Sequence, residues 1–146
     1  MDFHTLCIGC RTYRRFKQKQ IPEEILDELL ENARIANSAM NGQPLRYVLV
    51  KTSEAVRKIQ PCFHFAAALP KELGQPKEGE QPTAFIILCT EGRESPWTDM
   101  DIGIAVRTMN LNAYNHGVGS CILGNVEFES GSSLMKHPDA LYEVCA

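Results

Sequence analysis

The chain has 146 residues, of which 44% are hydrophobic and 23% are charged, and its formal net charge is −3. This balance predicts one globular domain, residues 1–146, with a single sizeable core. No apolar run approaches the ~20 residues of a membrane span, and the first residues lack the pattern of a secretory signal. We therefore expect a cytoplasmic protein that does not bind membranes, and the mild acidity argues against nucleic acid as a partner.

The first third of the chain is predicted to be mainly helical. A short helix is expected near residues 3–8. A second helix should begin at Pro22, a residue favoured in a first turn, and Glu23 and Glu24 complement the dipole of that helix. Its apolar residues recur at helical spacing and define one core face, namely Ile25, Leu26, Leu29, Leu30, Ala33 and Ala36.

A strand and a third helix should follow. Residues 45–50 have the apolar character of a strand, and residues 53–59 predict a short helix capped by Thr52 or Ser53. Residues 70–82 are rich in Pro, Gly, Lys and Glu, which is typical of an exposed loop. Such a loop is either a cover over a site or a plain surface connection.

The second half of the chain predicts the centre of the sheet and a long helix. Residues 83–90 form a continuous apolar run of strand length, which should be buried on both faces. Residues 99–116 predict a helix that is apolar around nearly its whole circumference, so it must be enclosed, for example by a partner subunit. Gly117 should end this helix, and residues 119–123 should form a short strand.

The last residues predict a weak helix over 130–137 and the beginning of a strand over 141–145. Alternating strands and helices would also suit a dinucleotide-binding fold, which needs a glycine-rich turn directly after its first strand. Lys51, Thr52 and Ser53 occupy that place. The sequence therefore argues against a dinucleotide-binding fold.

A dense group of cations follows the first predicted helix. Such a local excess must face an anion or water. Arginine forks match phosphate oxygens, and the Thr12 hydroxyl can donate to the same group, so a bound phosphate and a solvated basic turn both remain possible. Five positive side chains with no acid among them make up the group, namely Arg11, Arg14, Arg15, Lys17 and Lys19.

A polar segment, residues 37–44, connects the second predicted helix to the first strand. Amide side chains both donate and accept hydrogen bonds, and small side chains let a flat ring approach the backbone. The segment is therefore either a binding loop or an ordinary polar connection. It contains three amides and two small residues, namely Asn37, Asn41, Gln43, Ser38 and Ala39.

The six cysteines are scattered, and four of them sit inside apolar runs, which is typical of reduced, buried thiols. Cys7 and Cys10 form a C-x-x-C pair, which a thiol oxidoreductase or half of a zinc site would use. Only six residues precede Cys7, and no second pair has zinc spacing, so neither use fits well. We expect no metal.

Three segments together resemble one protein family, the FMN-dependent nitroreductases, in order, spacing and residue type. The resemblance implies an α+β fold, a three-layer sandwich in which a mixed, mostly antiparallel sheet is covered by helices. It also implies a homodimer with two cofactor sites at the subunit interface. The segments are CRTYRRFKQKQIPEE, ARIANSAMNGQPLRYVLV and DIGIAVRTMNLNAYNHGVGSCILGN.

The resemblance assigns a cofactor site residue by residue. The basic turn would hold the flavin phosphate and the polar edge of the ring, through Arg11, Thr12 and Arg14. A loop of the other subunit would approach the ring, through Asn37, Ser38, Ala39 and Asn41, with Gln43 behind it. A third segment would lie over the ring, with a backbone N–H near Gly124 directed at flavin N5, through Ile122, Leu123 and Gly124.

The implied activity is that of an FMN-dependent oxidoreductase with NADH or NADPH as the electron donor. It would pass two electrons to an electron-poor small-molecule acceptor, such as a nitroaromatic or a quinone, by a ping-pong mechanism. Because the flavin carries the chemistry, no side chain is assigned a catalytic role.

The sequence departs from the family pattern in ways that matter for flavin binding. Cys10 stands where an arginine is common, and Asn37 and Leu45 replace a common proline and a common tryptophan. Family members also continue beyond this point with the rest of a final strand, an arm that crosses to the partner, and further basic residues. The alternative is therefore a flavin-binding protein of the same fold with little or no turnover.

Overall fold

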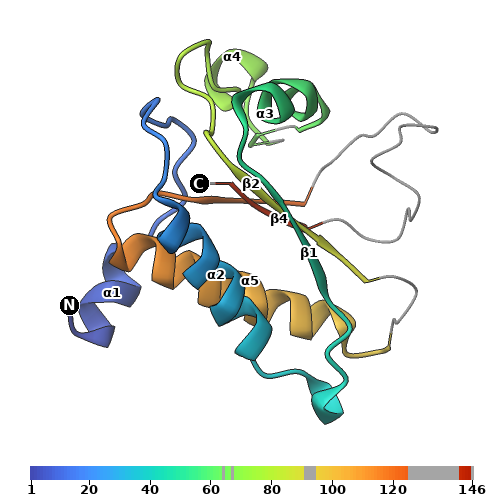
Figure 1. Ribbon diagram of the computed structural model, residues 1–146. Helices are drawn as coiled ribbons and strands as arrows, with labels where there is room; N and C mark the ends of the chain where they lie inside the picture. Colours follow the sequence, from blue (N-terminus) through green and yellow to red (C-terminus); the bar gives the residue numbers. More distant parts are fainter. Residues whose placement is uncertain (64, 67, 91–94, 125–141, 146) are drawn as a thin grey trace.

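The computed structural model describes residues 1–63, 65–66, 68–90, 95–124 and 142–145. These residues form three layers, with a sheet between two groups of helices (Figure 1). One helical layer consists of α2 (Glu23–Ile35) and α5 (Thr98–Asn115), with α1 (Phe3–Gly9) beside them. The other consists of α3 (Ser53–Ile59) and α4 (Lys71–Gly74), and two 3-10 turns, η1 (Ala39–Asn41) and η2 (Gln60–Cys62), complete the helical elements.

Within the described ranges, the sheet has four strands in the order β1-β2-β4-β3, and each pairing is antiparallel. A parallel contact also occurs, as an isolated bridge between Thr12 and Ser120. The predicted α+β class and mostly antiparallel sheet are confirmed, and the rejected dinucleotide fold, whose strands are parallel, is absent from the described residues. The strands are β1 (Arg46–Val50), β2 (Phe85–Cys89), β3 (Cys121–Leu123) and β4 (Tyr142–Cys145).

Strand β2 is buried on both faces, as its continuous apolar run predicts. Successive side chains of a strand point to opposite faces, so β2 contributes to two separate cores. Ile86 and Leu88 face α2 and α5, whereas Phe85 and Ile87 face the layer of α3. Phe63 stacks on Phe85 with the ring centroids 4.8 Å apart. The prediction that this segment forms an inner strand is confirmed.

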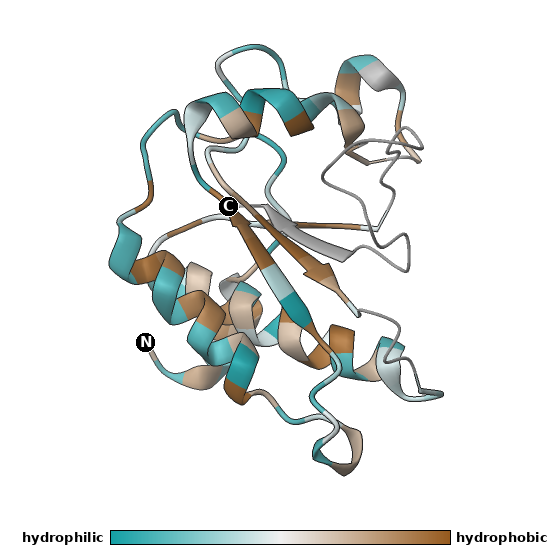
Figure 2. Ribbon diagram, turned by 45° about the vertical axis from the view of Figure 1, so that its right-hand side comes forward, coloured by the Kyte–Doolittle hydropathy of each residue, from teal (hydrophilic) through white to brown (hydrophobic). Residues whose placement is uncertain are grey.

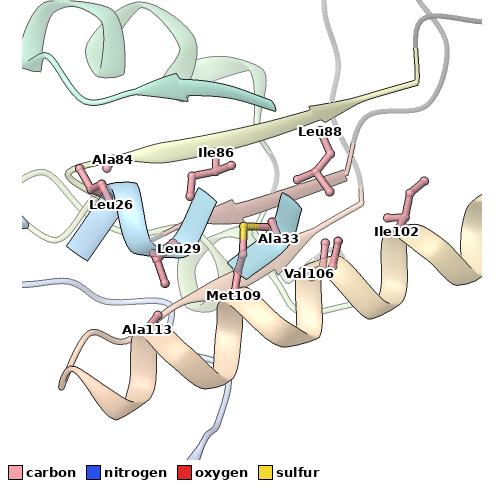
Figure 3. Packing of buried hydrophobic residues seen from close by; sticks show 11 residues of the cluster. Leu26, Leu29, Ala33, Ala84, Ile86, Leu88, Ile102, Val106, Met109 and Ala113 are labelled. Atoms are coloured by element: carbon pink, nitrogen blue, oxygen red, sulfur yellow. The ribbon is translucent and has the colours of Figure 1, made fainter. Parts of the chain in front are cut away.

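The core between α2, α5 and the sheet contains the residues that helical spacing selects. Leu29, Met109 and Ala113 have no exposed surface, and Figure 3 shows them between the two helices and β2. Apolar and polar bands alternate along α2 because one side faces this core and the other faces solvent (Figure 2). One detail of the prediction is wrong. Pro22 precedes the helix as its N-cap instead of standing in its first turn.

Helix α5 is not enclosed by the described residues of its own chain. Met100 and Ile104 are 59% and 37% exposed, and Gly103 and Arg107 are also exposed. Residues at positions i, i+3, i+4 and i+7 share one face of a helix, so these four form a continuous stripe, which we call the α5 stripe. The described residues of one chain therefore enclose one side of this helix only, and enclosure of the other side by a partner subunit stays a prediction.

The segment 70–82 is more ordered than a plain exposed loop. It contains the single turn of α4, and Gly74 and Pro82 are buried. A side chain at Gly74 would lie 2.8 Å from the carbonyl oxygen of Phe65, so the backbone fits closely there. Composition alone predicts an exposed connection here. It carries no information about the distant residues that hold the backbone of this segment.

The remaining predictions for single elements have mixed outcomes. The strand predicted over 141–145 is observed as β4, between β2 and β3. Gly117, with φ of +73°, follows α5 and ends it as expected. The helix predicted over 130–137 lies outside the described residues. Within the part of the chain that is described, we find no helix with the length and apolar character needed to cross a membrane.

Thr52, one of two candidate caps, is the N-cap of α3. Its side-chain oxygen accepts a hydrogen bond from the Ala55 N–H at 3.3 Å. Replacing Thr52 with Ala should lower the free energy of unfolding by about 1 kcal/mol, because that N–H loses its acceptor. Urea denaturation measures the change. Thr52→Ser keeps the acceptor and should remain near wild type, and equal losses in both variants would refute the assignment.

Candidate functional site

The basic turn runs along the outer edge of the sheet, beside β3. Thr12 forms a parallel bridge with Ser120, and the N–H of Tyr13 donates to the Ser120 carbonyl at 3.0 Å. Residues 11–14 and 122–124 are thereby brought to one edge of the sheet. Two of the three predicted groups of site residues are therefore neighbours within one protomer.

Side chains of the basic turn alternate in direction because the segment is extended. Tyr13 and Arg15 line a cavity of about 420 Å³ between the start of α2 and the end of α5. None of the predicted site residues lines that cavity. Thr12 and Arg14 share the other side of the segment, as their spacing of two requires.

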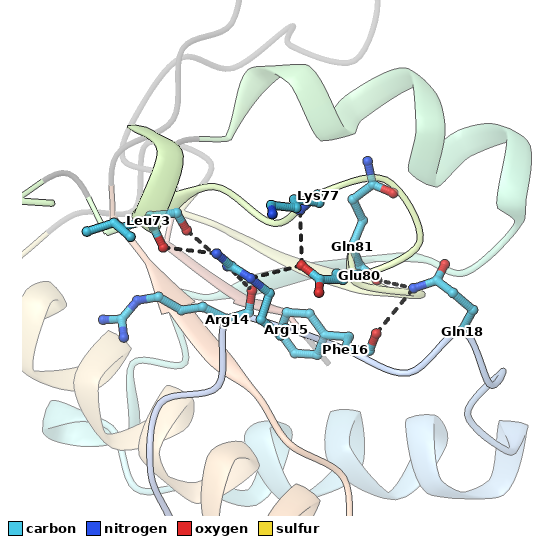
Figure 4. A network of polar contacts seen from close by, with 9 residues as sticks. Arg14, Arg15, Phe16, Gln18, Leu73, Lys77, Glu80 and Gln81 are labelled. Carbon is cyan, nitrogen blue, oxygen red and sulfur yellow. Dashed lines mark hydrogen bonds and ion pairs between the residues drawn. The ribbon is translucent and has the colours of Figure 1, made fainter. Parts of the chain in front are cut away.

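Arg14 has an unusual environment. Its Nε is buried and has no hydrogen-bond partner among the described residues. Figure 4 shows the side chain extending away from the contacts that Arg15 makes. A buried donor without a partner is costly and calls for an explanation, such as a bound acceptor.

Arg11 is only partly engaged. Its Nη1 donates to the carbonyls of Cys7 and Cys10, at 3.3 and 3.0 Å, at the end of α1. This contact holds the guanidinium against the helix terminus and fixes its place in the turn. The other nitrogens make no hydrogen bond to a described residue, so the charge of Arg11 remains available to an anion.

Arg15 has a structural role, and the anion that it faces is a carboxylate of its own chain. Its guanidinium donates to the carbonyls of Leu73 at 2.9 Å and Gly74 at 3.4 Å. Its Nε lies 3.0 Å from the Glu80 carboxylate. These contacts tie the segment 70–82 to the basic turn (Figure 4), and Gln18 adds a bond to the Gln81 carbonyl at 2.9 Å.

Replacing Arg15 with Lys should loosen α4, because an ammonium cannot reproduce the planar fork that reaches both carbonyls. We expect the amides of Leu73 and Gly74 to exchange with deuterium about tenfold faster. Hydrogen exchange by mass spectrometry measures this. Arg57→Lys, on exposed α3, is the control and should leave those amides unchanged. Unchanged exchange in Arg15→Lys would show that the fork does not hold the segment.

The loop after α2 is held in an unusual backbone conformation. Met40, Asn41 and Gln43 have φ of 53°, 54° and 44°, in the left-handed region that side chains other than Asn rarely adopt. Ser38 Oγ accepts from the Gln43 N–H at 3.0 Å. Such conformations persist only where the surroundings impose them, and they are common at binding sites.

Asp101 of α5 supports the same loop from inside the protein. The carboxylate is 3% exposed, and its Oδ1 accepts from the Ala39 N–H at 2.8 Å. Sequence reasoning missed this residue. The available signal was a carboxylate inside an otherwise apolar helix, because a buried acid requires a partner.

A cavity of about 200 Å³ lies under this loop and is lined by Asn37, Ser38, Gln43 and Asp101, among others. Tyr47 also lines it and donates to the Ala33 carbonyl at 3.2 Å. Burial raises the pKa of Tyr47, so the phenol stays protonated. The Tyr47 side chain therefore contributes no charge to the lining of this cavity.

One protomer does not bring the loop to the basic turn. Residues 11–14 precede α2 and residues 37–43 follow it, so the two groups lie at opposite ends of this helix (Figure 1). A helix of 13 residues is about 20 Å long. The predicted site residues therefore form two separate groups in a single chain.

The third predicted group, residues 122–124, offers a ligand mainly its backbone. Ile122 is 46% exposed, whereas Leu123 is 3% exposed and packs in the core behind β3. A side chain at Gly124 would meet no atom of a described residue within 4 Å. A ligand at this edge would meet Ile122 and the backbone of Gly124, but not the Leu123 side chain.

The cysteine pair does not form a disulfide. Cys7 and Cys10 are both thiols that are not joined to each other. Cys10 is 5% exposed and donates to Asn110 Oδ1 at 2.9 Å. Because Cys10 is buried, a reactant in solution cannot easily reach this thiol of the C-x-x-C pair. The burial therefore favours a structural role for Cys10.

These features describe a helix-covered antiparallel sheet with Arg11 and Arg14 at one edge. The chain matches the model of the nitroreductase family over residues 9–145, and it belongs to that family. The predicted resemblance is confirmed.

Solved structures support the fold. A nitroreductase family protein from Clostridium difficile 630 has a TM-score of 0.77 at 20% identity and covers 99% of this chain and 83% of its own. A nitroreductase with bound FMN from Bacteroides fragilis NCTC 9343 has a TM-score of 0.74 at 18% identity, covering 99% and 87%. At these identities the similarity establishes the three-layer fold alone.

Curated relatives cover the chain less completely. A protein of Methanothermobacter thermautotrophicus, provisionally named NADH dehydrogenase/NAD(P)H nitroreductase, is 28% identical over 78% of this chain. A protein of Archaeoglobus fulgidus with the same name is 30% identical over 78%. The chain spans 56% and 62% of the lengths of these two relatives.

Proposed function

We propose that this protein is an oxidoreductase that binds FMN and passes two electrons from NADH or NADPH to an electron-poor small molecule, such as a nitroaromatic or a quinone. The observation that carries the proposal is the Arg14 guanidinium, whose buried Nε has no partner at the edge of the sheet. Structural relatives described as containing FMN support the choice of ligand.

The residues at this edge fit a flavin mononucleotide. Arg11 and the exposed hydroxyl of Thr12 offer donors to a phosphate, and Arg14 offers a charged fork to the polar edge of a flat ring. No described residue fills the space that a side chain at Gly124 would take, so a ring can approach the backbone there without meeting one of them.

FMN, when bound, supplies the redox chemistry, so the chain needs no acid or base of its own. The contribution of the chain is placement and charge. Arg14 would lower the cost of negative charge on a neighbouring ligand, and the backbone N–H of Gly124 would supply a donor without a side chain. The apolar side chain of Ile122 in β3 would keep water from one side of the site.

We propose that two copies of the chain complete the site. The α5 stripe leaves apolar surface of Met100 and Ile104 uncovered, which a second copy of α5 would bury. The loop 37–43 is held rigid by Ser38 and Asp101, yet it lies at the far end of α2 from the basic turn. In a two-fold dimer, the loop of one subunit can reach the turn of the other.

A second candidate function is a flavin-binding protein without turnover. Cys10 favours it, because this residue is directed into the protein toward Asn110 and adds no charge to the turn. Loss of one charge-assisted phosphate contact weakens binding by about ten- to hundredfold. Partial occupancy and slow turnover would follow.

Flavin titration followed by reduction tests the proposal. Purified protein is titrated with FMN, and the quenching of flavin fluorescence gives the dissociation constant. NADH or NADPH is then added without oxygen, and the flavin colour should bleach and return when a nitroaromatic or quinone is supplied. Binding without bleaching supports the second candidate. No binding at saturating FMN contradicts both functions.

A further inference from the structure

A buried amide, Asn110 of α5, connects the two backbone segments of the candidate site. It is 5% exposed. Its Oδ1 lies 2.9 Å from the Cys10 thiol and 2.6 Å from Arg107 Nη1. Its Nδ2 donates to Ser120 Oγ at 2.6 Å. One side chain therefore bonds both to Cys10, which precedes the basic turn, and to Ser120, which precedes β3.

The orientation of this amide is determined by chemistry. A guanidinium has donors but no acceptor, so the group that faces Arg107 must be the amide oxygen. The amide nitrogen then points to Ser120, whose hydroxyl accepts. Ser120 is 2% exposed, so water does not compete for this contact, and an unpaired group there would be costly.

Two of the three partners of Asn110, Cys10 and Ser120, adjoin residues of the candidate site. Cys10 directly precedes Arg11, and its carbonyl accepts from Arg11 Nη1 at 3.0 Å. Ser120 forms the parallel bridge with Thr12 and accepts the Tyr13 N–H. Asn110 thus fixes the start of the basic turn from one side and its bridge to β3 from the other.

We propose that Asn110 is a positioning residue for the phosphate end of the FMN site, acting through Cys10 on Arg11 and through Ser120 on Thr12. This inference rests on the proposed function. It assigns Asn110 a role in selectivity. The amide holds the donors of the turn where a phosphate needs them, so the chain should prefer FMN over riboflavin, which has the same ring without the phosphate.

Two dissociation constants per variant test the inference, one for FMN and one for riboflavin, each from flavin fluorescence. Asn110→Leu keeps the branched shape and the number of non-hydrogen atoms of the side chain, and it removes all its polar contacts. Asn112→Leu is the matched control, because Asn112 lies on the same helix but faces Glu28 of α2. We expect Asn110→Leu to weaken FMN about tenfold or more. Riboflavin should change less than about twofold.

A second pair of variants covers the case in which Asn110→Leu does not fold. Cys10→Ala removes the thiol donor, and Cys10→Ser restores a donor to Asn110 Oδ1. The measure of selectivity is the dissociation constant for riboflavin divided by that for FMN. We expect this ratio to fall in Cys10→Ala and to recover in Cys10→Ser. A purely structural role would lower the thermal stability of the apoprotein and leave that ratio unchanged.

The outcomes separate this inference from the proposed function. Wild-type protein that binds FMN, together with an unchanged ratio in Asn110→Leu or Cys10→Ala, overturns the inference and leaves the function intact. Equal weakening of both ligands also overturns it. Wild-type protein that binds neither ligand overturns the function and the inference together.

Discussion

Replacing Arg14 with Met is expected to weaken FMN binding by about ten- to hundredfold, because a charge-assisted contact to the ligand is lost. The apoprotein should be at least as stable as wild type. Arg14 Nε is buried without a partner among the described residues, and Met removes that unsatisfied donor while keeping the length of the aliphatic stem. Affinity and apoprotein stability should thus respond in opposite directions.

Flavin fluorescence titration and the melting temperature of the apoprotein measure the two quantities. Lys17→Met is the control. The substitution removes a charge from the same segment, but Lys17 lines the cavity on the other side of that segment. It should change FMN affinity less than about threefold, mainly through the long-range field. A drop in apoprotein stability in Arg14→Met with unchanged affinity would show that this arginine stabilises the fold and does not hold the ligand.

The contrast between Arg14 and Arg15 shows where sequence reasoning stops. Both belong to one basic run, and composition cannot distinguish them. The structure separates them because neighbouring side chains of an extended segment point to opposite sides. Arg15 meets backbone carbonyls of Leu73 and Gly74, nearly sixty residues away in sequence, whereas Arg14 Nε meets no acceptor among the described residues.

The elements that were predicted correctly are those with a local signal. Helix α2 follows from helical spacing of its apolar residues, and β2 follows from an unbroken apolar run. The left-handed residues of the loop 37–43 have no such signal, because Met40 and Gln43 adopt positive φ only with support from Ser38 and the distant Asp101.

The same argument explains why Asn110 could not be found in the sequence. An asparagine in a helix is usually an exposed residue, and its partners Cys10 and Ser120 belong to different elements. Their meeting depends on how α5 crosses behind the basic turn. Order and spacing of motifs identified the family, but the contacts that tie the motifs to each other are tertiary and lie outside any local pattern.

Mixing two variants that are each impaired at limiting FMN should restore activity if the site is shared between subunits. Arg14→Met impairs the basic turn, and Ala39→Phe places a large ring in the loop where a flat ligand would approach. In the proposed dimer, the turn of one subunit and the loop of the other form each site. A dimer with one subunit of each kind then has one intact site and one site that carries both changes.

Coexpression of both variants, with a different affinity tag on each, yields three kinds of dimer. Random pairing makes about half of them mixed, and each mixed dimer has one intact site of two, so the pool should regain about a quarter of wild-type activity. NAD(P)H oxidation with a quinone acceptor measures this, and purification through both tags should raise the value to about half.

The result decides between a site shared by two subunits and a site within one subunit. If the turn and the loop served one site within a subunit, every subunit of the mixture would carry one defect, and no pairing would restore activity. The distance of about 20 Å along α2 argues against that arrangement, since Ser38 and Asp101 hold the loop at the far end of the helix. Recovered activity in the doubly tagged dimer requires the loop to cross to the partner's turn.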